Sequence, residues 1–340
     1  MFAADVPTYT IDLEKPEAER WAEVIAAEKV SAARLFAEAA REFERVPEFF
    51  RHAFARLYHL GGGLYRGEIK AWAESLGASV GALTLINCAY ELSHLRMPRP
   101  FGCTAGVRMV DGLGLVHVRN LDWPLAGLGD ATCLFRFQRG QRSFVVVGVP
   151  GQVGVLSGML PGAYSVTINW APPAGNPGLR FGPTFLVRDT LETHNTYEAA
   201  VGALQKTSVA ASVFFTVCGT EPGQACVIER TPRSAHVRPL EHVLAQANHH
   251  VGEKFSANNA DLDDVKEDEQ EFSREGSAAR ADSMTCALGG LTNAGTLEQA
   301  AQILDAEPVR NKFTCQQMAF CPRTGDVRVW RRLTQPVNKP

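Results

Sequence analysis

The chain has 340 residues and a mass of 37.0 kDa, enough for one large domain or two medium ones around a sizeable core. Acidic residues number 37 and basic residues 34, and this balance disfavours a general nucleic-acid-binding protein, which carries a basic surplus. No apolar run reaches the roughly 18 residues of a membrane-spanning helix, and the first residues do not resemble a secretory signal. We therefore expect a cytoplasmic protein.

The first hundred residues show the apolar periodicity of helices. Apolar side chains recur at three- and four-residue spacing over 21–43, 49–60, 64–76 and 79–93. The apolar stripe of the 46–60 helix is expected to join the core. The alternative is an amphipathic face that makes peripheral contact with a membrane. The proline-rich stretch at 97–100 closes this helical region.

After Cys103 the pattern changes to short β-prone runs separated by Gly and Pro. Helices are predicted near 184–193, 197–206, 278–288 and 296–304, and the acidic segment Asn258–Glu275 is predicted to be a solvated loop. We find no internal repeat. This order of elements indicates an α+β fold with layered sheets and helices. Strands are predicted over 104–110, 113–119, 133–137, 143–149, 164–169, 212–218, 225–229, 235–238 and twice within 314–330.

The eight cysteines are thinly spread, with no CxxC pair and no zinc-like Cys/His spacing, so no metal site is predicted. Most are expected to be small buried side chains in a reducing compartment. One thiol stands out because of its local surroundings. Asp111-Gly112 predicts a hairpin turn that folds the strand beginning at Cys103 back on its successor.

A two-residue loop places Cys103 opposite Asn120, and a three- or four-residue loop moves its partner to Leu121 or Asp122. Each alternative brings the thiol close to Arg119 and Asp122. A guanidinium beside a thiol lowers the thiol pKa, and a carboxylate can orient a donor and balance the positive charge.

This group of residues lacks a general base. His117 and the pair His249-His250 are candidates, but a packed strand residue and ordinary loop histidines are the simpler interpretations. Cleavage between Gly102 and Cys103 would supply a base, because the new α-amine has an ordinary pKa of roughly 7.7–8.0. The boundary between the helical and β regions falls at this bond.

Several motifs resemble the acid ceramidase and N-acylethanolamine-hydrolysing acid amidase branch of the N-terminal-nucleophile (Ntn) hydrolases, in the choloylglycine hydrolase superfamily. Arg and Asp follow the Cys at the family's spacings of 16 and 19 residues. The other similar segments are the family's propeptide opening, its NxAYE segment, its glycine-rich strand pair, its QTN motif and its late VxNK segment. They correspond here to Thr10–Leu13 with Arg20-Trp21, Asn87–Glu91, Gly154–Gly162 with Ser165–Asn169, Gln246–Asn248 and Val309–Lys312.

The resemblance implies a four-layer αββα Ntn-hydrolase fold made as a precursor. Residues 1–102 would be a helical propeptide or α-subunit, and residues 103–340 the catalytic β-subunit, with the two remaining together as a heterodimer after cleavage. The family's roles fall on six residues. Cys103 would be the nucleophile, Arg119 would stabilise its thiolate and contact the reacting carbonyl group, Asp122 would hold the α-amine, Asn248 would donate to the oxyanion together with a backbone N–H or Asn169, and Arg280, with Arg274 as second choice, would match a further family arginine.

The implied activity is hydrolysis of a small N-acyl amide, of N-acylethanolamine or ceramide type, through a thioester, with no cofactor and no metal. A penicillin V or bile-salt type amidase, an acyltransferase, a non-catalytic lipid-binding module and a thiol enzyme using His249 or His250 are the alternatives. The chain departs from the mammalian lipid amidases at Trp170, where they have Glu. It also lacks paired cysteines near its termini, which fits a reducing compartment.

Overall fold

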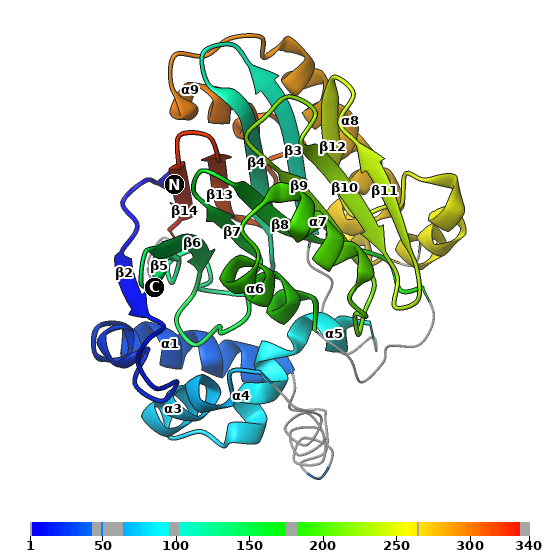
Figure 1. The fold of residues 1–340 in the computed structure, drawn as a ribbon. Coiled ribbons are helices and arrows are strands. Elements are labelled where there is room, and N and C mark those ends of the chain that lie inside the picture. The colour runs from blue at the N-terminus through cyan, green and yellow to red at the C-terminus, as the bar shows by residue number, and fades with distance from the viewer. Residues whose placement is uncertain are drawn as a thin grey trace, which may run out of the picture.

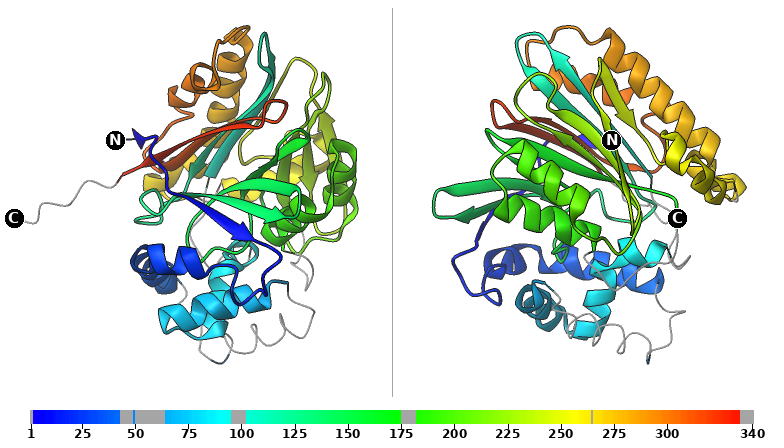
Figure 2. Two further views of the ribbon diagram at one scale, coloured as in Figure 1. Left: turned by 60° about the vertical axis from the view of Figure 1, so that its left-hand side comes forward. Right: turned by 45° about the vertical axis from the view of Figure 1, so that its right-hand side comes forward.

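Two β-sheets lie face to face at the centre of the protein, and helices cover the outer face of each (Figure 1). A computed structural model describes residues 2–42, 49, 64–94, 102–174, 182–263 and 265–333. The right-hand view of Figure 2 shows the helix, sheet, sheet and helix layers in succession. The predicted αββα arrangement is confirmed.

The first sheet has six strands, and the hairpin that begins at Gly102 lies within it. Gly106 on this hairpin lies so close to α8 that a Cβ atom would come within 2.5 Å of Leu288 Cδ1, which lets the helix pack directly on the strand. The strand order is β1 (Phe2–Ala3), β14 (Asp326–Arg332), β13 (Thr314–Cys321), β4 (Gly114–Asp122), β3 (Gly102–Val110) and β12 (Val243–Gln246).

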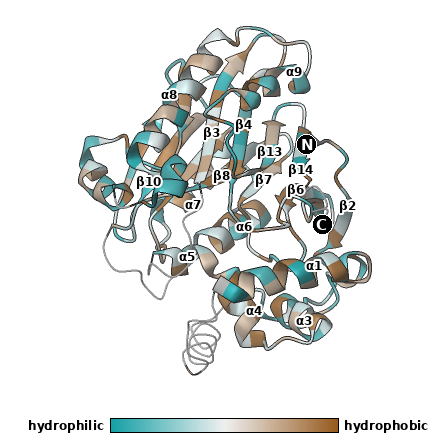
Figure 3. Cartoon of the chain, turned by 180° about the vertical axis from the view of Figure 1, so that it is seen from behind, coloured by the Kyte–Doolittle hydropathy of each residue, from teal (hydrophilic) through white to brown (hydrophobic). Residues whose placement is uncertain are grey.

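The second sheet has eight strands. Its edge strand β2 pairs with β5 in parallel, whereas the other neighbouring strands of this sheet pair antiparallel. Its strands are mostly apolar, as the brown colouring in Figure 3 shows, because both of their faces are covered. The strand order is β11 (Ala235–Pro239), β10 (Ala225–Arg230), β9 (Val213–Cys218), β8 (Tyr164–Trp170), β7 (Ser157–Leu160), β6 (Arg142–Gly148), β5 (Cys133–Arg139) and β2 (Thr8–Asp12).

Helices α8 (Arg274–Gly290) and α9 (Leu297–Ala301), with the 3₁₀ turn η3 (Gln302–Asp305), cover the first sheet (Figure 1). Helices α6 (Pro183–Thr193) and α7 (Tyr197–Lys206) cover the second. Local sequence fixes their starts. Pro183 occupies the first turn of α6, and the Thr196 hydroxyl accepts a hydrogen bond from the Ala199 N–H at 3.2 Å to cap α7.

The N-terminal helices α1 (Ala22–Glu42), α3 (Arg66–Leu76), α4 (Val80–Asn87) and α5 (Ala89–Ser93) pack together at one end of the sandwich (Figures 1 and 2). The N-terminal segment also extends both sheets, because β1 pairs with β14 and β2 pairs with β5. Residues 1–102 are thus joined to the rest through strands as well as helices.

A buried ion-pair cluster ties α3 to α6. Arg188 donates two hydrogen bonds to the Glu68 carboxylate, at 2.6 and 2.7 Å, and both side chains are fully buried. Arg20 and the Trp21 indole donate to the same carboxylate at 2.9 and 2.6 Å. Arg188 also lies 3.9 Å from the centre of the Tyr65 ring. These contacts hold the pKa of Glu68 below its ordinary value despite its burial.

Most predicted elements are present, with three differences. The predicted helix over 79–93 is interrupted at Cys88 and forms α4 and α5. Short strands β1, β2 and β12 were not predicted, and β7 was expected only through the resemblance, as part of the glycine-rich strand pair. The predicted 46–60 helix, with its membrane hypothesis, lies outside the described residues except for Phe49.

The prediction of a solvated loop over Asn258–Glu275 is wrong. This stretch contains the second half of the 3₁₀ turn η1 (Glu253–Leu262), all of η2 (Glu267–Phe272) and the start of α8. Its apolar side chains anchor it despite its acidic composition. Phe272 stacks on Phe313 with ring centroids 4.8 Å apart and lies against Gly102, where a Cβ atom would come within 2.8 Å of the Phe272 ring.

Candidate active site

The β3–β4 hairpin brings the thiol and the guanidinium together. Val110 pairs with Gly114, so the turn has three residues and Cys103 lies opposite Leu121. This is the second of the alternatives considered from the sequence. Gly112 and Gly114, at φ +84° and +94°, supply the left-handed backbone that this turn requires.

Arg119 donates to Cys103 Sγ from Nη2 at 2.9 Å, and both residues are fully buried between the sheets. The same guanidinium donates to the Ser157 hydroxyl and to the carbonyl oxygens of Leu156 and Ile168. These acceptors fix its plane, so its charge is directed at the sulfur.

The Cys103 thiol has a raised pKa in this structure, whereas its proximity to Arg119 predicts a lowered one. Complete burial is the dominant cause, and the Asp122 carboxylate also raises the pKa. The Arg119 guanidinium and a backbone hydrogen bond from Trp170 oppose this shift. Desolvation of the thiolate therefore outweighs the single positive charge.

Asn248, just after β12, receives the backbone N–H of Cys103 on its Oδ1 at 3.0 Å. Arg280 Nη2 donates to the same oxygen at 2.6 Å. The Asn248 Nδ2 donates to the Trp170 carbonyl at 2.9 Å, and the Asn248 backbone N–H donates to the Ser277 hydroxyl at 2.8 Å. The Asn248 amide therefore contacts Cys103 at the nitrogen of the predicted cleavage bond.

Asp122 lies at the end of β4, opposite Gly102. Its carboxylate accepts hydrogen bonds from the Thr314 hydroxyl at 2.6 Å and from Asn311 Nδ2 at 2.9 Å, and it lies 3.8 Å from Arg280 Nε. Burial raises its pKa, and Arg280 is the largest opposing influence. The Cys103 N–H therefore donates to Asn248, whereas the Asp122 carboxylate accepts from Thr314 and Asn311.

The further arginine of the site is Arg280, on α8. It is fully buried, and its Nε donates to the Thr104 hydroxyl at 3.1 Å and its Nη1 to the Glu271 carbonyl. Arg274 begins the same helix and is exposed. The acidic segment supplies the Glu271 carbonyl, so it forms part of the wall of the site.

Asn169 lies at the end of β8 and is fully buried. Its Nδ2 donates to the carbonyl oxygens of Gln246 and Ala247, at 2.8 and 3.1 Å. Both of its amide hydrogens are therefore engaged in holding the segment that precedes Asn248.

The candidate histidine bases form hydrogen bonds elsewhere. His117 spans the two sheets, with Nδ1 2.9 Å from the Ser165 hydroxyl and Nε2 3.0 Å from the Thr167 hydroxyl, and burial lowers its pKa to about 3.

The neighbouring pair has its own partners. His249 Nδ1 lies 2.9 Å from the Ser277 hydroxyl, and His250 Nδ1 lies 3.0 Å from the Glu229 carboxylate. Each of the three histidines is thus placed as a packed structural residue.

Sequence reasoning missed the acceptors that orient Arg119 and the backbone of Trp170. Ser157 lies on the short strand β7, which only the resemblance indicated, and the carbonyl groups carry no side-chain signal. The glycine-rich resemblance around 154–162 pointed to this region without identifying its role.

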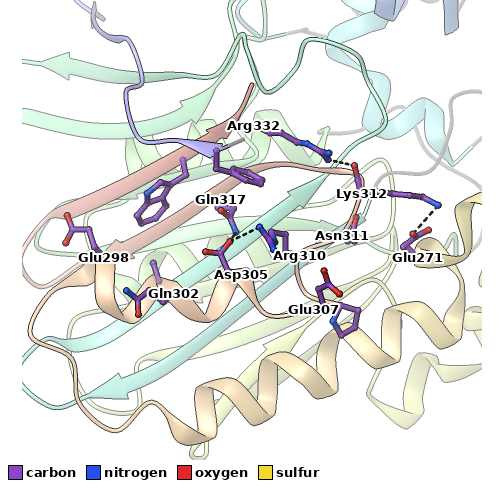
Figure 4. A pocket seen from close by; sticks show the side chains of 14 residues that line it. Glu271, Glu298, Gln302, Asp305, Glu307, Arg310, Asn311, Lys312, Gln317 and Arg332 are labelled. Atoms are coloured by element: carbon purple, nitrogen blue, oxygen red, sulfur yellow. Dashed lines mark hydrogen bonds and ion pairs between the residues drawn. The ribbon is translucent and has the colours of Figure 1, made fainter. Parts of the chain in front are cut away.

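A polar groove of about 910 Å³ lies on the other side of the first sheet (Figure 4). Its charged walls are paired in part, with Arg310 3.7 Å from Asp305 and Lys312 3.2 Å from Glu271. Asn311 lines this groove and also donates to Asp122, so the groove is one side chain away from the candidate site.

Within the described ranges, no cluster of three or more His, Cys, Asp or Glu side chains is arranged to hold a metal ion. None of the helices in those ranges combines the length and apolar character needed to span a membrane. All eight cysteines are free thiols, and Cys286 alone among them is exposed.

Comparison with known proteins agrees with this geometry. The family model described as acyl-coenzyme A:6-aminopenicillanic acid acyl-transferase matches residues 110–275. Acid ceramidase from Mus musculus is 27% identical over 262 residues, covering 67% of this chain and 64% of the relative. N-acylethanolamine-hydrolyzing acid amidase from Oryctolagus cuniculus is 31% identical over 188 residues, covering 52% and 51%. The chain is similar in sequence to these two groups of proteins.

The resemblance noted in the sequence is thereby confirmed. The solved structure of a Caenorhabditis elegans N-acylethanolamine-hydrolyzing acid amidase ortholog superposes with a TM-score of 0.50 at 24% identity, covering 66% of this chain and 94% of that chain. This likeness shows a shared Ntn-hydrolase fold. The chain spans less than two thirds of the length of the acid ceramidases it matches.

Proposed function

We propose that the chain is a cysteine Ntn amidase that cuts itself between Gly102 and Cys103 and then hydrolyses N-acyl lipid amides of N-acylethanolamine or ceramide type. The observation that carries this proposal is that Cys103 has a side-chain partner at its sulfur and another at its backbone nitrogen. Arg119 donates to Cys103 Sγ at 2.9 Å, and Asn248 accepts from Cys103 N at 3.0 Å. Any buried backbone N–H needs an acceptor, but a structural cysteine needs no guanidinium at its sulfur, so the Arg119 contact is the distinctive one.

Self-cleavage begins with attack of the Cys103 sulfur on the Gly102 carbonyl carbon. The C–N bond breaks, the thiol proton passes to the departing nitrogen, and a thioester joins Gly102 to the sulfur. Water then hydrolyses the thioester and releases the Gly102 carboxylate and a free thiol. Gly102 suits this step because a Cβ atom there would come within 2.8 Å of the Phe272 ring, so a larger residue would push this ring away from the bond.

Turnover uses the α-amine that the cut exposes. The amine takes the Cys103 proton, the thiolate attacks the substrate carbonyl carbon, and the protonated amine returns its proton to the leaving nitrogen. Arg119 stabilises the thiolate, and Asn248 Oδ1 holds the amine in place. Asp122, with Arg280, supplies the balancing charge.

The oxyanion requires donors in addition to Arg119. Asn248 Nδ2 uses one hydrogen on the Trp170 carbonyl and keeps the other for the oxyanion. A donor of this type contributes about 2.7–4 kcal/mol in the transition state. Asn169 acts by orienting the segment before Asn248, because its own hydrogens are engaged.

The substrate class is supported by an apolar cavity beside the nucleophile. Its volume is about 80 Å³, and its walls come from α1, α4 and the first residue of α5 on one side and from the two sheets on the other. Leu121, the strand partner of Cys103, and Leu156, whose carbonyl receives Arg119, both line it. A fatty acyl group would enter here, and the α1 side chains would move apart to admit a long chain. Acid ceramidase and N-acylethanolamine-hydrolyzing acid amidase carry such substrates in their names.

Intact-mass analysis and denaturing electrophoresis test the self-cleavage. The wild-type chain should yield fragments of 102 and 238 residues, and Cys103→Ala should stay whole. Cys315→Ala is the matched control, because its thiol is also buried and lies near Asp122 but donates to the Leu121 carbonyl at 3.3 Å. Cleavage in Cys103→Ala, or its loss in both variants alike, would contradict the proposal.

Mass spectrometry of products tests the substrate. A fatty-acyl ethanolamide, a ceramide, penicillin V and a bile-salt conjugate are compared with the cleaved enzyme. Release of fatty acid from the first two supports the proposal, whereas turnover of only the last two replaces the substrate class. The family-model match favours acyl transfer as the second candidate, and a new amide formed with an added amine would support that candidate.

A further inference from the structure

Helix α5, in the N-terminal region, and its C-terminal cap residue contact three consecutive residues, 169–171, at the end of β8. Tyr90 makes the first contact. Its hydroxyl lies 3.3 Å from the Asn169 carbonyl and 2.9 Å from the Ser212 carbonyl, and the side chain is buried. The hydroxyl therefore fixes the backbone where β8 ends beside β9.

Ser93 and His94 make the next two contacts. The Trp170 indole N–H donates to the Ser93 hydroxyl at 2.8 Å, and His94 Nε2 lies 3.1 Å from the Ala171 carbonyl. The His94 and Trp170 rings lie with centroids 5.7 Å apart. Trp170 stands where the mammalian lipid amidases have Glu, and its indole needs an acceptor, which Ser93 provides.

The opposite side of the same backbone meets the reacting residue. The Ile168 carbonyl accepts from Arg119, the Trp170 carbonyl accepts from Asn248, and the Trp170 backbone hydrogen-bonds the Cys103 sulfur. Arg119 and Asn248, which both contact Cys103, are thus held by one backbone segment, and the other side of this segment packs against α5.

We propose that Tyr90, Ser93 and His94 are positioning residues of the active site, acting through residues 169–171. The N-terminal region is then a working part of the reaction centre before and after the cut, rather than only a removable propeptide. A displacement of this backbone by about 1 Å costs on the order of 10²-fold in rate. The catalytic consequence of this inference rests on the proposed function.

Tyr90→Phe tests the inference, with Tyr164→Phe as the matched control. Both hydroxyls are buried and meet two backbone carbonyls, but Tyr164 lies at the other end of β8 and meets Thr190 and His194. Ser93→Ala is the second variant and removes the acceptor of the Trp170 indole. Unfolding stability is measured for each, so that the variants are compared at known structural cost.

The deciding readout is the pH profile of Cys103 alkylation by iodoacetamide, followed on the Cys103 peptide in whichever form, whole or cut, is isolated. We expect Tyr90→Phe and Ser93→Ala to move the midpoint to higher pH, because the Trp170 backbone no longer supports the thiolate. We also expect self-cleavage to slow roughly tenfold to a hundredfold. In the cleaved enzyme kcat falls and KM stays unchanged. Tyr164→Phe should alter none of these.

Three outcomes are separable. Equal midpoints and cleavage rates in Tyr90→Phe, Ser93→Ala and Tyr164→Phe would overturn the positioning role. A wild-type chain that never cuts itself, with a shifted midpoint in Tyr90→Phe alone of the two Tyr variants, would refute the proposed function and support the positioning role. If Tyr90→Phe does not fold, an unshifted Ser93→Ala overturns the inference by itself.

Discussion

Glu91, on α5, is a buried carboxyl group whose replacement has a calculable effect on stability. It is 9% exposed, and neither carboxylate oxygen has a hydrogen-bond partner among the described residues. It packs against the start of α6, where a Cβ atom on Gly182 would come within 2.1 Å of its Oε1. Burial raises the Glu91 pKa from 4.5 to about 7, and the residue's own backbone N–H opposes this only in part.

The sign of the pH dependence follows from proton binding. Between pH 4.5 and 7 the folded chain keeps a proton on Glu91 that the unfolded chain has lost, so the free energy of unfolding falls as the pH rises through this window. Each pH unit costs about 1.4 kcal/mol, and the whole window costs about 3 kcal/mol. Above pH 7 the loss is complete.

His94, which follows α5 directly, changes the pH dependence of stability in the opposite direction. Burial lowers its pKa from 6.5 to about 4, so its contribution to stability rises with pH between those values. The two side chains nearly offset each other in the wild-type chain. The Glu91→Gln variant keeps the histidine effect and loses the carboxyl effect, so the difference between variant and wild type isolates Glu91.

The assay is urea unfolding followed by tryptophan fluorescence at pH 5 and pH 8, in a Cys103→Ala background that keeps the chain whole. Relative to its own parent, Glu91→Gln should be more stable at pH 8 than at pH 5 by about 2.5 kcal/mol, because pH 5 already lies inside the window. The exposed Glu74→Gln is the control and should show no such change. A Glu91→Gln difference that is the same at both pH values would refute the reasoning.

Three further predictions concern single contacts. Arg119→Gln should abolish self-cleavage, since it removes the positive charge from the Cys103 sulfur, and a time course of intact mass would detect any remaining cut. Glu68→Gln should lower the unfolding free energy by about 1.5–3 kcal/mol, because Arg188 stays buried and keeps only the Glu192 carboxylate, at 2.9 Å, as denaturant titration would measure. Asn311→Ala should remove a hydrogen bond to the Asp122 carboxylate, cost about 1.5–3 kcal/mol and slow self-cleavage, and unchanged cleavage kinetics would contradict that role.

The sequence predicted those parts of the site that depend on local geometry. Cys103 and Arg119 lie on adjacent strands of one hairpin, so the Asp111-Gly112 turn alone brings them close. The turn length decides the partner of Cys103, and it required the structure, because two-, three- and four-residue loops are all compatible with the sequence.

Contacts between distant segments could not be derived in this way. Asn248 contacts Cys103 although it lies 145 residues away in the sequence, and Arg280, which contacts Asn248, lies further still. Only the resemblance pointed to these two residues. Strands β7 and β12 have four residues each, too few to show an alternating pattern. The acidic segment was mispredicted because its charges mask the few apolar anchors, such as Phe272, that fold it over the site.

On the proposed route, two features keep the uncut chain from acting on substrates. The thiol is fully buried, which raises its pKa, and the nitrogen that would serve as base is still a peptide N–H donated to Asn248. Cleavage converts that N–H into an amine with a lone pair at the same place, so Asn248 can hold it without rearrangement. Asp122 and Arg280 already lie 3.8 Å apart as a buried ion pair, and the buried Arg119 guanidinium is held by the Ser157 hydroxyl and two backbone carbonyl groups. Because the desolvation of these charges is met during folding, both the break of the Gly102–Cys103 bond and the hydrolysis of the thioester take place beside a prepared site.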